Sequence, residues 1–156
     1  MNDVMRGAIG GLAGTVVMSA AMAASRLTGT MRGEVPPRKV GGNFEEAVGI
    51  RDDLSREEFE ASWVAQHLAY GTAGGVAYAL LERKFGSPRP EVAGPLFGVA
   101  LWAFGYAGWL PAAGLYPAPT EDKPGRMGPM ILHHLVYGAT TAIVARSLSR
   151  PGRGAS

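Results

Sequence analysis

The chain has 156 residues, of which 47% are hydrophobic and 18% are charged, with a net charge of +2 and no cysteine. The lack of cysteine excludes disulfides, thiolate nucleophiles, iron–sulfur ligation and thiolate zinc sites. Because the basic residues form no single cluster, we expect no nucleic acid among the partners.

Four stretches of the chain lack Asp, Glu, Lys and Arg: 7–25, 61–81, 92–120 and 127–145. A helix rises 1.5 Å per residue, so about 20 apolar residues cross a ~30 Å hydrocarbon core. A soluble chain this short has too little polar sequence to cover four helices that are apolar on every side. The sequence therefore predicts an all-α membrane protein, a single domain over residues 1–150 that forms an up-and-down bundle of four transmembrane helices with the lipid bilayer as its partner.

The first predicted span covers residues 4–25. Arg6, the apolar run after it and Ala21-Met22-Ala23 resemble a secretory signal with its cleavage site. The run is rich in glycine rather than leucine, however, and Asp3 precedes it. We therefore expect the first helix to be retained.

A polar loop, residues 26–60, follows the first span. Consecutive Pro36 and Pro37 predict extended backbone. Asn43 then offers an N-cap for a short helix at the membrane surface, with an apolar face that includes Phe44. Ser55 and Glu58 have the spacing of a capping box, which predicts the start of the helix that becomes the second span, 61–82.

The remaining predicted spans are 92–111 and 129–148, and a basic tail, 151–156, ends the chain. Pro95 is expected in the first turn of the third span, where its missing N–H costs little. Positive charge in the short second loop and in the tail favours cytoplasmic termini. We accordingly expect a multi-pass membrane protein with both termini in the cytoplasm.

The second and fourth spans carry matching segments: His67-Leu-Ala-Tyr-Gly71 and His134-Leu-Val-Tyr-Gly138. A fainter echo links Gly7-Ala-Ile-Gly-Gly11 with Gly94-Pro-Leu-Phe-Gly98. Together they predict two related hairpins with a pseudo-twofold axis along the membrane normal. Small residues also recur four apart, as helix packing in lipid requires, either within the bundle or in a homo-oligomer or larger complex.

The matched segments supply the candidate site. His67 and Tyr70 share one helix face, as do His134 and Tyr137, and a twofold axis would bring both pairs into one pocket. Such a pocket can bind haem through paired imidazoles, hold a metal, contact a quinone or relay protons. Alternatively, these residues are interfacial and have structural roles. We regard this as the leading expectation and therefore expect that the chain binds no cofactor. His133 is expected to face away from His134.

No catalytic constellation is present, so we expect no enzyme and no catalytic residues. The glycine-rich span starts lack the Gly-Lys-Ser/Thr of a phosphate loop, and the carboxylates gather in the first loop. The charge-free stretches leave no charged residue in the interior of the predicted spans that could form an ion pathway, which argues against a pump or channel.

Several motifs occur in order along most of the chain: Arg-Gly-Ala-x-x-Gly-Leu-Ala-Gly-Thr from Arg6, Pro-Pro-Arg at 36–38, two His-x-x-Tyr-Gly segments, and Gly-x-x-x-Trp-Ala-x-x-Tyr-x-Gly-Trp-Leu-Pro at 98–111. This pattern resembles the YagU-like family of small bacterial inner-membrane proteins, a group with no established activity. The resemblance implies a bacterial multi-pass protein of the cell inner membrane. Our leading expectation for function is a non-enzymatic accessory or stress-related membrane component. A cofactor-binding or proton-relaying protein and a small-solute transporter are the alternatives.

Overall fold

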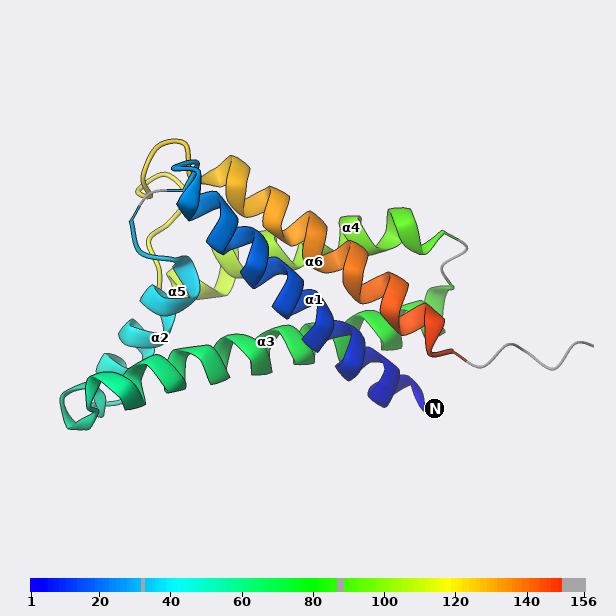
Figure 1. Ribbon diagram of the computed structural model, residues 1–156, viewed down its shortest axis with the longest axis horizontal. Coiled ribbons are helices and arrows are strands. Elements are labelled where there is room, and N and C mark those ends of the chain that lie inside the picture. Colours follow the sequence, from blue (N-terminus) through cyan, green and yellow to red (C-terminus); the bar gives the residue numbers. More distant parts are fainter. Residues whose placement is uncertain (32, 87–88, 150–156) are drawn as a thin grey trace, which may run out of the picture.

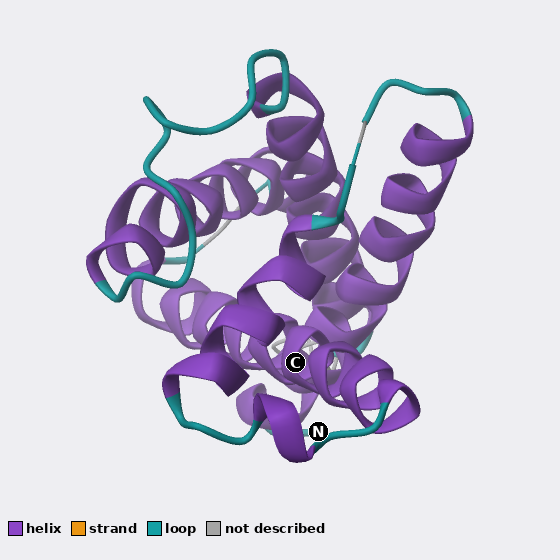
Figure 2. Ribbon diagram, turned by 90° about the vertical axis from the view of Figure 1, so that its left-hand side faces the viewer, coloured by secondary structure: helices purple, strands orange, loops and turns teal. Residues whose placement is uncertain are grey.

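The computed structural model describes residues 1–31, 33–86 and 89–149, and this part of the chain is helical with no strand (Figure 2). The all-α fold class is thus confirmed, whereas the predicted basic tail, 151–156, lies outside the described residues. The elements, in chain order, are α1 (Asp3–Leu27), α2 (Pro36–Ala47), the 3₁₀ turn η1 (Arg51–Asp53), α3 (Arg56–Phe85), α4 (Pro90–Phe104), the π-helical turn η2 (Gly105–Trp109), α5 (Leu110–Ala112) and α6 (Met127–Ser147).

The four long helices α1, α3, α4 and α6 alternate in direction, as an up-and-down bundle requires (Figure 1). The N-terminus, the end of α3 and the start of α4 lie at one end of the bundle. The other end, which we call the loop end, carries α2, α5 and the segment between α5 and α6. Because η2 and α5 continue α4, the third helix runs to Ala112, one residue past the predicted limit.

Two helical segments of the described chain are long and apolar enough to cross a membrane: Asp3–Leu27, with a mean hydropathy of 1.6, and Pro90–Ala112, with 1.2. Only 39% and 22% of their most apolar windows are buried, unlike a soluble core helix, which is mostly buried. α3 and α6 do not meet the same criterion. The structure therefore supports membrane crossing for two helices, and the other two spans stay a prediction.

The helix starts agree only partly with the sequence. The capping box of Ser55 and Glu58 is confirmed at the start of α3. The expected extended Pro-Pro segment is wrong: α2 begins at Pro36, where a proline at the first helical position loses no hydrogen bond. Asn43 therefore lies inside α2 instead of capping it. Pro95 also lies inside a helix, because α4 begins at Pro90.

Glycines let the helices of each hairpin approach until their backbones touch. A side chain on Gly11 would overlap the carbonyl oxygen of Gly71 across the α1–α3 contact, and one on Gly94 would overlap that of Gly138 across the α4–α6 contact. Two hairpins with matching contacts agree with the predicted repeat. The sequence match pairs Gly94 with Gly7. In the structure, however, the contact of Gly94 with α6 corresponds to the contact of Gly11 with α3, so the repeat is shifted by one helical turn.

The two hairpins do not pack symmetrically. α1 contacts α6 as closely as it contacts α3, since side chains on Gly10 and Gly14 would meet Thr141 and its neighbours. The equivalent pair, α3 and α4, touches at few points. One of these is an edge-to-face contact between Tyr78 and Phe97, with ring centroids 5.4 Å apart. Towards the loop end, α3 and α4 are therefore not joined by a close backbone contact.

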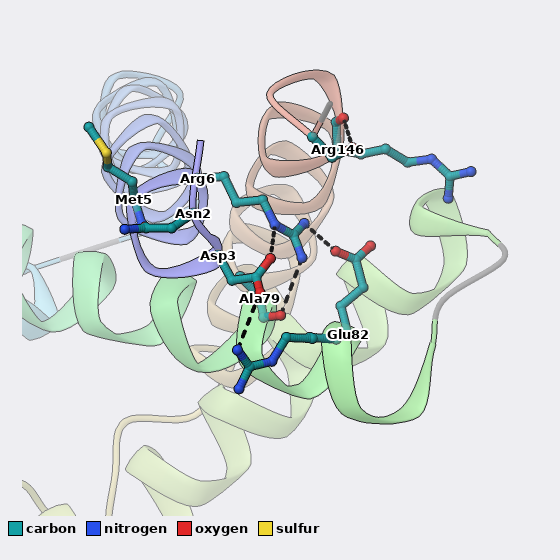
Figure 3. Close-up of polar contacts among 9 residues, drawn as sticks. Asn2, Asp3, Met5, Arg6, Ala79, Glu82 and Arg146 are labelled. Carbon is teal, nitrogen blue, oxygen red and sulfur yellow. Dashed lines mark hydrogen bonds and ion pairs between the residues drawn. The ribbon is translucent and has the colours of Figure 1, made fainter. Parts of the chain in front are cut away.

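A buried ionic cluster closes the opposite end (Figure 3). The guanidinium of Arg6 donates to Glu82 at 2.5 Å, to Asp3 at 2.9 Å and to the carbonyl of Ala79 at 3.4 Å. Arg83 adds a longer ion pair to Asp3. Because Arg6 is buried and its charge is matched, this cluster ties the start of α1 to the end of α3.

The glycine contacts yield a test of the fold. Gly98→Ala should destabilise the α4–α6 hairpin by about 1–3 kcal/mol, because the new methyl group would overlap the carbonyl oxygen of His134. Gly128→Ala is the matched control, since no atom lies within 4 Å of the added methyl group. Equilibrium unfolding in mixed micelles measures both variants, and equal stability of the two would contradict the packing described.

Candidate functional site

A cavity of about 590 Å³ is lined by residues of α1, α2, α3, α4, η2 and α6 and of the loops at the loop end. This volume is within the range of small-molecule sites, roughly 300–1,000 Å³. The wall is almost wholly apolar: four methionines contribute thioether side chains, and aromatic rings come from α2, α3, α4, η2 and α6. The lining methionine and aromatic residues are Met18, Met22, Met31, Met130, Phe44, Tyr70, Trp102, Tyr106, Trp109, Tyr116 and Tyr137.

All four candidate residues line this one cavity: His67 and Tyr70 from α3, and His134 and Tyr137 from α6. One imidazole and one phenol thus come from each of two helices. Tyr137 is buried and donates to the carbonyl of Gly71 on α3 at 2.6 Å. The structure therefore brings the two matched segments together, with the phenol of one bonded to the backbone of the other.

The expectation that His133 faces away from the pocket is wrong, because His133 and His134 both line the cavity. The cavity is wide enough to reach two positions about 100° apart on α6. The two rings differ in their bonds, however. His133 Nε2 bonds the hydroxyl of Ser25 at 2.9 Å, whereas His134 Nδ1 bonds the carbonyl of Met130, one turn earlier, at 2.8 Å.

Three polar atoms of lining side chains are buried without a hydrogen-bond partner: His67 Nε2, Trp102 Nε1 and His133 Nδ1. Buried polar atoms are satisfied in the great majority of cases, so a group of them in one wall is unusual. Sequence reasoning missed Trp102 and the methionines because apolar side chains in a predicted span give no sign of which way they face.

α2 covers the cavity from the loop end, and its Val40 and Phe44 form part of the wall. Arg38 on α2 forms an ion pair with Glu60 on α3 at 2.8 Å. The Arg38 guanidinium, together with the indole N–H of Trp63, holds the pKa of the Glu60 carboxyl below its usual value. α2 also carries Glu45, which is wholly buried; one of its oxygens accepts from Gln66 and the other has no partner.

A second buried network supports the same wall. The Arg126 guanidinium donates to the Tyr116 hydroxyl at 2.8 Å and to the backbone carbonyl of Glu34, and it pairs with Asp122 at 3.4 Å. Tyr106 also donates to Asp122. Burial raises the pKa of the Tyr116 phenol to about 12, so this ring stays neutral at physiological pH.

On one side of the cavity, a pair of aromatic rings joins α3 to η2. Trp109 of η2 donates its indole N–H to the Tyr70 hydroxyl at 3.4 Å, and the ring centroids lie 6.0 Å apart. Tyr70 is 39% exposed, so this pair lies at the surface where α3 and α4 have few contacts. The π-helical turn that places Trp109 is a form often found at functional sites.

The described residues contain no group of three or more His, Asp or Glu placed to hold a metal ion. The three cavity histidines therefore do not form a metal site of their own. What the cavity offers is a set of imidazoles, thioethers and flat rings in apolar surroundings.

Comparison of the sequence with models of protein families identifies the family of this chain. A model of a family of unknown function, DUF6789, matches residues 1–154, and the chain belongs to this family. No curated protein and no solved structure matches it. The family gives no residue a role, so the chemistry of the site has to be argued from the cavity itself.

The Arg126 network predicts a large effect of one substitution. Arg126→Met should destabilise the protein by about 3–5 kcal/mol, because the carboxylate of Asp122 would stay buried without its charge partner. Adding Asp122→Asn should recover most of that loss by removing the unpaired charge. Unfolding of both variants in mixed micelles measures the effect, and a double variant as unstable as the single one would contradict this interpretation.

Proposed function

We propose that this chain is a four-span membrane protein that binds a lipid-soluble, ring-containing small molecule in the cavity at its loop end. The observation that carries the proposal is the apolar cavity in which both His-x-x-Tyr-Gly segments meet. Among the functions expected from the sequence, the proposal favours a cofactor-binding protein with paired His and Tyr faces over a purely accessory role.

The membrane location is supported by the apolar side chains that all four long helices direct outward. α1 and α4 satisfy the length and hydropathy criterion. α3 and α6 have 30 and 21 residues, enough to cross ~30 Å of hydrocarbon. Each also exposes large apolar residues, for example Leu81 on α3 and Ile143 on α6. In water these faces would form large apolar patches, whereas lipid covers them without cost.

The wall of the cavity determines the kind of molecule it suits. Flat rings such as those of Trp102 and Tyr106, stacked with centroids 5.3 Å apart, favour a flat partner. Methionine side chains adapt their shape to fill the space that remains. No charged side chain lines the cavity, so the enclosed part of the ligand should be uncharged.

A lipid-soluble ligand needs a route that avoids water. The seam between α3 and the α4–η2 segment supplies one, because α3 and α4 have few contacts and the Tyr70–Trp109 ring pair lies at the surface there. Separating these two rings would open the cavity sideways towards the bilayer.

Binding of this kind requires no chemical step, in agreement with the expectation that the chain is not an enzyme. An accessory or stress-related role is compatible with it, since a bound small molecule can be the signal or the cargo. The YagU-like resemblance, the inner-membrane location and the cytoplasmic termini stay predictions from sequence.

Native mass spectrometry of protein gently extracted from its own membranes tests the proposal. We expect a bound small molecule in the wild type and at least a tenfold lower occupancy in Leu101→Trp, because the indole would fill the cavity that Leu101 lines. Leu96→Trp is the matched control: it lies on the same helix but is 64% exposed.

Two results would refute a binding role. One is a wild-type protein that carries only detergent or bulk phospholipid. The other is a ligand that survives equally in both tryptophan variants, which would place it outside the cavity.

A further inference from the structure

The bond of His134 fixes what its ring offers to the cavity. The carbonyl oxygen of Met130 can only accept, so His134 Nδ1 carries the hydrogen. In a neutral imidazole the lone pair is then on Nε2, for which the described residues supply no hydrogen-bond partner. Histidines that ligate a metal typically have this arrangement, with one nitrogen donating to a carbonyl and the other free to bind.

A second imidazole lies near the first. His67 is on α3 and lines the same cavity. Its Nε2 is buried without a partner. Two neutral imidazoles on separate helices can bind one metal centre from two sides.

The small number of ligands decides which metal centre fits. A bare ion needs about four protein ligands, and the described residues contain no such group. Haem iron already has four nitrogen ligands from its own ring and takes only one or two from the protein. The flat apolar ring would then occupy the space lined by aromatic and methionine side chains, which a bare ion would leave empty.

The edge of the cavity suits the carboxylate groups of a haem. Haem has two carboxylate groups at one edge, and these need cations. The ammonium of Lys39 lies 5.4 Å from the ring centroid of Tyr116, a residue of the cavity wall. Lys39 forms no ion pair within the described residues. This ammonium therefore lies beside a wall that itself carries no charged side chain.

We propose that the cavity is a haem site, with His134 Nε2 as the first axial ligand and His67 as the second. The ring lies among Trp102, Tyr106 and the methionines, and its carboxylates face the ammonium of Lys39 next to Tyr116. This assignment rests on the proposed binding function, because it names the molecule that the cavity takes.

Titration of the detergent-solubilised full-length protein with ferric haem tests the assignment. The wild type should give the sharp, red-shifted Soret band of six-coordinate, low-spin iron with two imidazole ligands. His134→Ala should bind haem at least tenfold more weakly and lose this spectrum. His67→Ala should retain haem but give five-coordinate, high-spin iron.

Leu132→Ala is the matched control, because Leu132 lies on the same helix as His134 but is 57% exposed and does not line the cavity. It should keep both affinity and spectrum. A wild-type spectrum equal to that of haem in micelles would overturn the assignment, and this result does not depend on how any variant folds. Equal haem affinity of wild type and His134→Ala would overturn it too.

Native mass spectrometry separates failure of this assignment from failure of the binding function. If wild type carries an iron-free molecule that Leu101→Trp excludes, and takes up no haem, the haem assignment is wrong and the binding function stands. If neither haem nor any other small molecule occupies the cavity, both are wrong.

Discussion

Contact between helix backbones at glycine is the constraint on which the rest of this structure depends. α1 has two glycine faces, one against α3 and one against α6, so it holds both of these helices close. α4 has one such face, against α6, and touches α3 at few points. Because α1 fixes α3 and α6 while α4 follows α6 alone, the bundle is tight on one side and open on the other. The cavity is the space that this unequal packing leaves at the loop end.

Charge is arranged around that cavity and kept out of its wall. At the far end, Arg6 is matched by two carboxylates, and at the loop end Arg126 is matched by Asp122. Buried pairs of this kind add little net stability but are costly to break, so they fix where the helix ends and loops lie. Glu45 is the exception, a buried carboxylate with one unpartnered oxygen on the helix that covers the cavity. Movement of α2 would expose that oxygen to water.

The sequence was sufficient for the features that repeat or are periodic. Charge-free stretches located the long helices, and the matched His67 and His134 segments pointed to residues that the structure places in one cavity. It was insufficient wherever rotation about a helix axis decides the outcome. Nothing in the sequence shows that Trp102 faces inward and Leu96 outward. The start of α2 was misplaced because Pro36 satisfies two rules, extended backbone and first helical position, and only the tertiary contacts of α2 choose between them.

The repeat also explains why its two histidines need not have equal roles. In the fourth span, His134 bonds the carbonyl of Met130, four residues earlier, which fixes its tautomer. His67 stands at the matching position of the second span, but its Nε2 has no hydrogen-bond partner. Trp63, four residues before His67, donates its indole N–H to Glu60. One ring is therefore held in place and the other is less restrained. A pair of this kind suits a ligand that is anchored from α6 and closed over from α3, the helix that also contributes Tyr70 to the lateral seam.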